Sequence, residues 1–133
     1  MTQLKTNSCP VCGKPAAKYC SQVCFHEGDY QHWKRSVLRK GRIPHHCNAT
    51  PRIKRFMAEQ FGDGCAICGR KTWLGRKIAL IFDHINGNHQ DWHLSNCRLV
   101  CSNCDAQLPT YKGHNCGNGR YTRRMRYRHG KSY

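Results

Sequence analysis

Acidic residues are scarce in this sequence. Asp and Glu together number 7 against 23 Lys and Arg, which leaves a net charge of +16 on 133 residues. A surface so short of negative charge attracts polyanions, and nucleic acid is therefore the expected partner. The charge balance alone does not separate an enzyme from a binding protein or from a basic surface that only aids solubility.

Long apolar runs are also absent. No stretch approaches the roughly 18 consecutive apolar residues of a membrane-spanning helix, and no apolar run of the kind found in signal peptides follows Met1–Lys5. We therefore expect an intracellular protein with no membrane partner. A hydrophobic fraction of 38% in 133 residues is too small for a large core, so additional crosslinks are expected to hold the fold together.

Cysteine, in contrast, is abundant, with 11 residues. An odd count without a secretory signal disfavours a disulfide framework and favours metal binding. Two four-cysteine sets are each predicted to close the tetrahedral shell of one structural Zn²⁺. They are Cys9, Cys12, Cys20 and Cys24, and Cys65, Cys68, Cys101 and Cys104. Because four thiolates outweigh one Zn²⁺ by two charges, the net charge would fall to about +12.

The order of these features divides the chain into four predicted parts. They are an N-terminal zinc finger at 1–28, a basic helical segment at 29–63, a segment at 64–113 that carries the candidate chemistry, and a basic C-terminal arm at 114–133. Cys47 and Cys116 belong to neither cysteine set, and we predict that both are unligated thiols.

Two helices are expected in the helical segment. Asp29 is a candidate N-cap for the first helix, and Tyr30, Trp33 and Val37 follow it at helical spacing. The second helix is predicted to begin at Thr50-Pro51 and to end at Gly62. Its apolar face comprises Ile53, Phe56, Met57 and Phe61.

Candidate DNA contacts lie at the joint between these helices and in the C-terminal arm. The joint offers Arg39, Lys40 and Arg42, and the arm offers Arg120, Arg123, Arg124, Arg126 and Arg128. Guanidinium groups interleaved with tyrosines suit contacts to phosphates and to the minor groove. The alternatives are a solvated charged turn for the joint and a solubilising tail for the arm.

The segment 64–113 is expected to form a ββα unit. A strand rich in β-branched and aromatic residues at 77–83 leads into Asp83-His84, and Asn86-Gly87 indicates a tight turn. A second strand at 97–100 leads back to the last cysteine pair, and a short helix is predicted to start at Asp105. The second zinc ion would clip this unit together, so the predicted fold class is α+β.

The motifs in this segment resemble those of the HNH endonuclease family, and especially its small phage members. They are Cys65-Ala-Ile-Cys68-Gly69, then Asp83-His84-Ile85-Asn86-Gly87-Asn88, and then Asn96-Cys97-Arg98-Leu99-Val100-Cys101-Ser102-Asn103-Cys104-Asp105. The resemblance implies a ββα-metal, treble-clef-like nuclease domain that hydrolyses phosphodiester bonds of double-stranded DNA. It further implies a free-standing homing-type endonuclease, acting in the cytoplasm of a host bacterium if a phage encodes it.

The resemblance also implies roles for individual residues. His84 would be the general base that takes a proton from the attacking water, and Asn96 would hold the loop that carries this base. Asp83 and Asp105 would bind one catalytic divalent ion, Mg²⁺ or Mn²⁺, because carboxylate oxygens are hard ligands.

The sequence departs from the family pattern at Asp105, where relatives have His or Asn. Trp92, His93 and Cys97 also replace residues that are common in relatives. Two alternatives follow: an inactive copy of such an enzyme, or a non-catalytic zinc-dependent protein that binds nucleic acid. His89 and His93 are predicted to face solvent or DNA rather than to bind metal.

Overall fold

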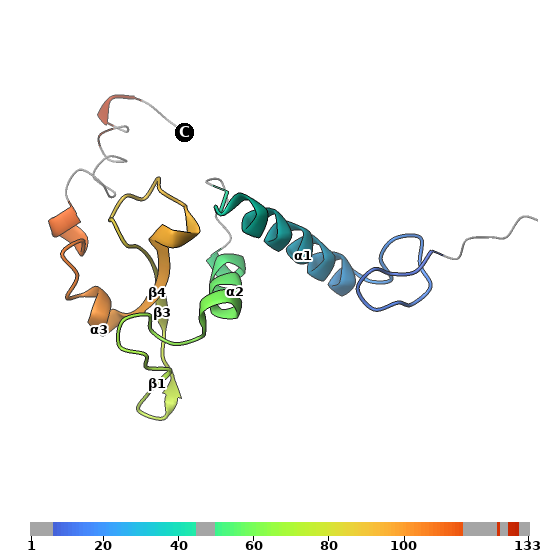
Figure 1. The fold of residues 1–133 in the computed structure, drawn as a ribbon, viewed down its shortest axis with the longest axis horizontal. Coiled ribbons are helices and arrows are strands. Elements are labelled where there is room, and N and C mark those ends of the chain that lie inside the picture. The colour runs from blue at the N-terminus through green and yellow to red at the C-terminus, as the bar shows by residue number, and fades with distance from the viewer. Residues whose placement is uncertain (1–6, 45–49, 116–124, 126–127, 131–133) are drawn as a thin grey trace, which may run out of the picture. The chain divides into compact units, whose positions relative to one another are not determined.

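The computed structural model describes residues 7–44, 50–115, 125 and 128–130. Its residues group into two compact units, Met1–Lys40 and Gly41–Tyr133 (Figure 1). Among the described residues, no helix combines the length and the apolar character that crossing a membrane requires. Cys47, Cys116, Arg120, Arg123, Arg124 and Arg126, all named above, lie outside the described residues.

The first unit joins the N-terminal cysteine cluster to helix α1 (Gln22–Lys40). This helix starts earlier than predicted, because the hydroxyl of Ser21 accepts a hydrogen bond of 3.2 Å from the main-chain N–H of Cys24 and so caps the first turn. The prediction of Asp29 as the N-cap is therefore wrong, and Asp29 lies inside the helix. Tyr30 and Val37, two residues of the predicted apolar face, are buried.

Aromatic packing fixes the start of α1 to the finger. The Tyr19 ring lies so close to Gly28 that a Cβ atom at this position would stand 2.4 Å from the ring. Tyr19 also meets Phe25 edge-on, with ring centroids 5.6 Å apart. The predicted boundary at 28/29 therefore falls inside a packed helix, and the first unit continues to Lys40.

The first helix of the second unit is α2 (Thr50–Phe61), whose start and end match the prediction. Ile53, Phe56 and Met57 are buried, and the N–H of Gly62, which has a φ of +96°, bonds to the Ala58 carbonyl and ends the helix. The prediction that Phe61 belongs to the packed apolar face of this helix is wrong. Its side chain is 62% exposed, because the chain turns away directly after it.

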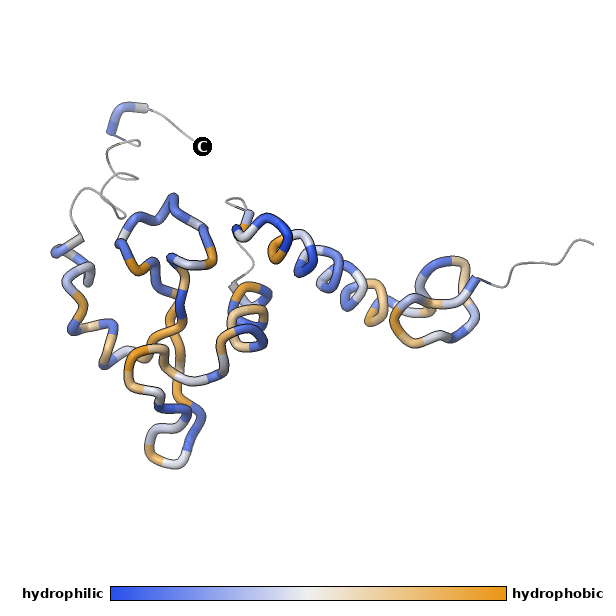
Figure 2. The backbone as a smooth tube through the Cα atoms, in the orientation of Figure 1, coloured by the Kyte–Doolittle hydropathy of each residue, from blue (hydrophilic) through white to orange (hydrophobic). Residues whose placement is uncertain are grey.

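Strands β3 (Leu80–His84) and β4 (Cys97–Cys101) form an antiparallel pair, and helix α3 (Ser102–Asp105) follows directly. A short 3₁₀ helix, η1 (Leu94–Asn96), lies in the loop between the two strands, and a second, η2 (Lys112–Asn115), follows α3. Figure 2 shows apolar residues along α2, β3 and β4 and mostly hydrophilic residues in the loop that joins the two strands. The predicted α+β class and ββα order are therefore confirmed.

Two boundaries in this unit differ from the prediction. The strand expected at 77–83 starts at Leu80, because residues 76–77 belong to a separate hairpin made of β1 (Thr72–Trp73) and β2 (Arg76–Lys77). The short helix starts at Ser102 rather than at Asp105. Helical structure thus begins inside the last cysteine pair.

Candidate active site

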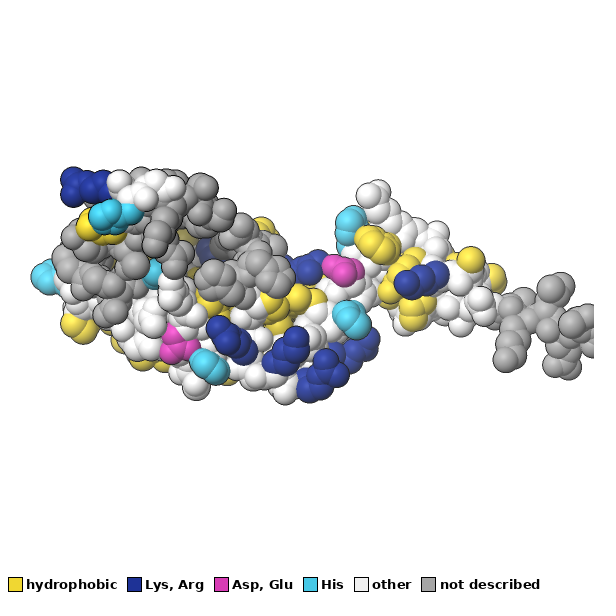
Figure 3. Space-filling model, turned by 90° about the horizontal axis from the view of Figure 1, so that it is seen from above, with side chains coloured by type: hydrophobic (Ala, Val, Ile, Leu, Met, Phe, Trp, Pro, Cys, Tyr) yellow, Lys and Arg dark blue, Asp and Glu magenta, His cyan; other side chains and the backbone are white. Residues whose placement is uncertain are grey.

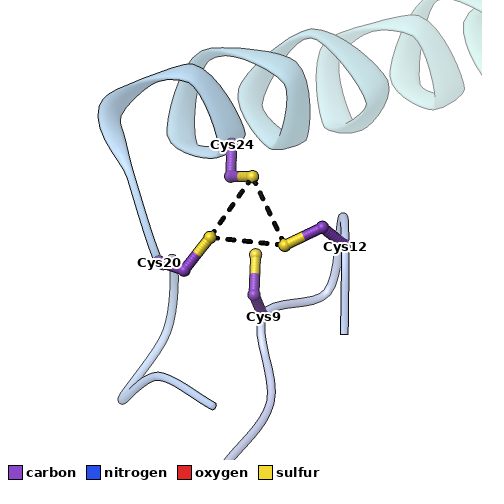
Figure 4. Close-up of side chains that lie close together, drawn as sticks. All are labelled: Cys9, Cys12, Cys20 and Cys24. Atoms are coloured by element: carbon purple, nitrogen blue, oxygen red, sulfur yellow. Dashed lines mark hydrogen bonds between the residues drawn. The ribbon is translucent and has the colours of Figure 1, made fainter. Parts of the chain in front are cut away.

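The first cysteine set forms a cluster at the start of α1. Figure 4 shows the thiols of Cys9, Cys12, Cys20 and Cys24 turned toward one another. Their sulfur atoms all lie within 4.8 Å of each other, and the Cys12–Cys20 and Cys12–Cys24 separations are 3.3 and 3.7 Å. Tetrahedral Zn²⁺ with Zn–S bonds of about 2.3 Å places its sulfurs about 3.8 Å apart. The cluster therefore fits a zinc site.

The second set, Cys65, Cys68, Cys101 and Cys104, forms an equivalent cluster at the base of the β3–β4 pair. All four sulfurs lie within 4.8 Å of one another, and those of Cys68 and Cys101 are 3.8 Å apart. Burial raises the pKa of Cys65, but main-chain amides outweigh this effect and lower it to about 6. One of these amides, the N–H of Cys101, lies 3.3 Å from the Cys65 sulfur. A sulfur held as a thiolate is ready to bind metal.

The two knuckles have the same main-chain geometry. In each, the main-chain carbonyl of the first cysteine accepts a hydrogen bond from the N–H of the glycine four residues later. The N–H of the same cysteine donates to the carbonyl of the residue after that glycine. The distances are 2.9 and 2.8 Å for Cys9 and 2.8 and 3.0 Å for Cys65. Gly13 and Gly69 have φ values of +76° and +73°, a conformation that glycine adopts without strain. The repeated turn explains why both sequences read CxxCG.

His84 ends strand β3, opposite Cys97 on β4. Its Nδ1 lies 3.0 Å from the main-chain oxygen of Asp91. Because a carbonyl only accepts, Nδ1 carries the proton in this contact, and Nε2 of the neutral ring is left as the basic atom. Burial lowers the pKa of His84 below the ordinary histidine value, although the Asp91 carbonyl opposes this shift. The ring is therefore neutral near pH 7 and able to accept a proton.

Two aromatic rings, Trp92 and Phe82, pack against the His84 imidazole. Trp92 meets it edge-on with centroids 4.8 Å apart, and Phe82 does so at 5.2 Å. The two aromatic rings are themselves stacked, with centroids at 5.4 Å and planes 20° apart. This packing restricts rotation of the imidazole.

Asn96, which is 8% exposed, ties together the loop that carries His84. Its side-chain amide donates to the Asp91 carbonyl at 3.0 Å and to Oδ1 of Asn86 at 2.9 Å, and its own Oδ1 accepts from the Asn86 N–H at 2.9 Å. The same Asp91 oxygen thus receives Asn96 and His84. These bonds link Asn96 to the loop, and its role in orienting His84 stays a prediction.

We predict that replacing Asn96 with Ala lowers both stability and cleavage. The change leaves the Asn86 N–H and the Asp91 carbonyl each without one partner, which costs about 1–3 kcal/mol of unfolding free energy. Chemical denaturation measures this loss, and steady-state kinetics should show a larger fall in kcat than rise in KM. Ser95→Ala is the matched control, because the Ser95 side chain is exposed on the neighbouring position of η1. Equal kcat values for Asn96→Ala and the parent would exclude an orienting role.

Two carboxylates lie on the elements beside His84. Asp83 is the preceding residue on β3, and its Oδ2 accepts a 2.7 Å bond from Nε of Arg98, which stands directly opposite on β4. Asp105 lies at the end of α3. Burial, and then repulsion from the Asp83 charge, raise the pKa of Asp105. Carboxylate oxygens are the ligands that a hard divalent cation prefers, so the chemistry of Asp83 and Asp105 fits such an ion.

The two histidines of the loop, His89 and His93, differ in their exposure. Nδ1 of His93 lies 2.7 Å from Oδ1 of Asp91, and the His93 side chain is 60% exposed. His89 is half-buried. Among the described residues, every cluster of three or more candidate metal ligands consists of cysteines alone, so neither histidine joins one.

Sequence reasoning did not assign roles to Phe82, Trp92 or Arg98, or to the carbonyl of Asp91. The position of Arg98 was detectable, since pairing the two predicted strands in register sets it against Asp83. The Asp91 carbonyl could not be detected from the residue type, because every residue supplies a carbonyl.

The candidate DNA contacts that the structure describes are exposed. They are Arg39, Lys40, Arg42 and Arg128. Figure 3 shows Lys and Arg side chains gathered along α1.

Comparison with known proteins identifies a relative. The chain is 34% identical over 91 residues to the H-N-H endonuclease F-TflIV of Escherichia phage T5, a match that covers 68% of this chain and 31% of that protein. The chain therefore spans about a third of the length of this curated relative. No protein-family model and no solved structure matches the chain. The match and the two four-cysteine clusters confirm the resemblance to phage HNH endonucleases.

Proposed function

We propose that this chain is a metal-dependent DNA endonuclease that hydrolyses phosphodiester bonds, of the free-standing homing type. The observation that carries the proposal is the environment of His84: a neutral imidazole that is oriented through Nδ1 and follows Asp83 on strand β3. A protein that only binds DNA has no need of an imidazole that is held neutral and in one orientation. The relative of phage T5 supports the nuclease assignment.

In the proposed reaction, Nε2 of His84 accepts a proton from a water molecule whose oxygen attacks the phosphorus atom. The bond to the 3′ oxygen breaks, which yields a 5′ phosphate and a 3′ hydroxyl once that oxygen is protonated. The Asp91 carbonyl stabilises the imidazolium through its bond to Nδ1–H. Asn96 keeps that carbonyl in position.

Asp83 and Asp105 are the proposed ligands of the catalytic ion, Mg²⁺ or Mn²⁺. When bound, such an ion neutralises the charge that develops on the phosphate and on the leaving oxygen. Arg98, on the neighbouring strand β4, donates a hydrogen bond to one oxygen of Asp83. The two cysteine clusters would each hold a structural Zn²⁺, since four thiolates leave no open coordination position for catalysis.

Double-stranded DNA is the proposed substrate. The net charge of +16 and the exposed Arg39, Lys40, Arg42 and Arg128 suit contacts to phosphates. The competing proposal is a zinc-dependent protein that binds nucleic acid without cleaving it. Incubation with supercoiled plasmid, with and without added Mg²⁺, separates the two: nicked or linear product that appears only with Mg²⁺ supports the nuclease, and persistent supercoiled plasmid supports the binding protein.

Asp105 provides a test of the catalytic metal site. Asp105→Ala should weaken activation by Mg²⁺ and Mn²⁺, because one hard oxygen ligand is lost, whereas Asp105→His and Asp105→Asn should retain part of the activity and change the preferred metal. Metal titrations of cleavage measure these effects, and zinc content should stay unchanged in all three variants. Parental activation of Asp105→Ala across the titration would remove Asp105 from the metal site.

A further inference from the structure

The β1–β2 hairpin carries a residue that its own fold does not explain. Leu74 and Gly75 are the two central residues of the turn, with φ values of +49° and +74°. Turns of this kind favour Asn, Asp or Gly, because positive φ strains a residue with a bulky side chain. Leu74 is also 88% exposed. Neither the backbone conformation nor burial favours leucine here, and strain of this kind often accompanies function.

Trp73, next to this strained residue, is 46% exposed. Together Trp73 and Leu74 form an apolar tip. Basic residues lie on both sides of the tip: Arg70 and Lys71 precede β1, and Arg76 and Lys77 form β2. The Arg70 guanidinium lies 5.3 Å from the Trp73 ring centroid, and Lys71 pairs with Asp63 at 2.8 Å. The hairpin thus presents an exposed apolar tip with basic residues on either side.

An open groove of about 640 Å³ runs beside the hairpin. Trp73 and Arg76 line it on one side, and Ser102 and Asn103, at the start of α3, line it on the other. Cations and exposed polar side chains therefore border the same groove as the apolar tip. These groups match a sugar–phosphate backbone, which combines anionic oxygens with hydrogen-bond acceptors.

We propose that the β1–β2 hairpin is a second DNA-contacting element, in which Leu74 and Trp73 insert against base pairs in the minor groove while the flanking cations bind phosphates. This inference rests on the proposed function, since it concerns the same DNA substrate. Apolar side chains inserted between base steps and flanked by cations are a known way to bind and bend the duplex. A protein partner fits less well, because protein interfaces are depleted in lysine.

The position of the hairpin defines where on the DNA this contact falls. Strand β3 starts beside the hairpin at Leu80 and ends at His84, a run of about 14 Å at about 3.4 Å per residue. Duplex DNA also rises by about 3.4 Å per base pair. With β3 aligned along the duplex axis, this length corresponds to about four base pairs between the hairpin contact and the phosphate attacked by the water that His84 activates.

Binding of the zinc-loaded, full-length protein to a fluorescein-labelled, mixed-sequence duplex three helical turns long tests the proposal. Leu74→Asn keeps the turn, because Asn tolerates positive φ. We expect an equal or higher Tm, an affinity about tenfold lower, and an unchanged dependence of affinity on salt. Arg70→Gln combined with Arg76→Gln should instead reduce the slope of log K against log salt by about two, because each phosphate contact contributes about 0.9.

Phe61→Ser is the matched control, since Phe61 is also an exposed apolar residue of the second unit. It should leave the affinity and the slope unchanged. Parental affinity in Leu74→Asn, or a parental slope in the double variant, overturns the proposal, as does a change of sedimentation mass in Leu74→Asn with no loss of DNA affinity. Plasmid cleavage tests the proposed function separately: a parent protein that binds the duplex but never cleaves refutes the nuclease alone, and the binding data still decide on the hairpin.

Discussion

His84→Ala should lower the rate of DNA cleavage by at least about 10²-fold and up to about 10⁴-fold, the range that a positioned general base contributes. The loss should appear in kcat, because the base acts on the water in the transition state and contributes little to the binding of DNA. Plasmid cleavage at saturating Mg²⁺ measures the rate. DNA affinity and zinc content should stay near the parental values.

His93→Ala is the control for this variant. His93 belongs to the same loop and contacts the same residue, Asp91, but through the side chain and in an exposed position. It should retain most of the activity. Full activity of His84→Ala would refute the proposed mechanism, and circular dichroism of both variants shows whether either has lost its fold.

Replacement of Cys101 with Ser should unfold the second unit. The Cys101 sulfur belongs to the cluster that joins the knuckle at 65–68 to the end of β4, and its side chain is 2% exposed. A structural Zn²⁺ contributes about 10 kcal/mol or more to folding, which is comparable with the whole stability of a small domain. We expect zinc content to fall from two ions per chain to one, together with loss of cooperative thermal unfolding of this unit.

Cys97→Ala provides the matched control. Cys97 is buried on the same strand, but it belongs to neither cluster, and burial raises the pKa of its thiol to about 12. This variant should keep two zinc ions and lose only the stability that a small cavity costs. Elemental analysis giving two zinc ions in Cys101→Ser, or fewer than two in the parent, would contradict the four-cysteine assignment.

Most of the second unit could be predicted from its sequence, because each element has a strong local signal. CxxC pairs indicate the crosslinks, and a run rich in β-branched and aromatic residues indicates β3. Thr50-Pro51 and Gly62 indicate the ends of α2. The β1–β2 hairpin was missed, since its turn is Leu74-Gly75 rather than the usual Asn-Gly. The start of α1 was misplaced because the helix begins inside the finger. Its cap is the bond from the N–H of Cys24, a cysteine of the first cluster, to the Ser21 hydroxyl.

The side chains of the candidate site could be proposed from the sequence, whereas their main-chain contacts could not. Asp83, His84 and Asn96 follow from a motif in which each residue type matches its chemistry. The contact between Nδ1 and the Asp91 carbonyl depends on how the loop folds back over seven positions, which no single residue encodes. The aromatic packing of Trp92 on His84 is equally a product of this loop conformation.

The contact between a main-chain oxygen and the His84 imidazole affects how this protein is able to diverge. A substitution at position 91 changes the side-chain bonds to Asn86 and His93, but it leaves the carbonyl in the chain. An inserted or deleted residue between 84 and 91 moves that carbonyl away from the imidazole, whatever the new sequence contains. Evolutionary constraint in this loop should therefore fall on its length more heavily than on the identity of residue 91.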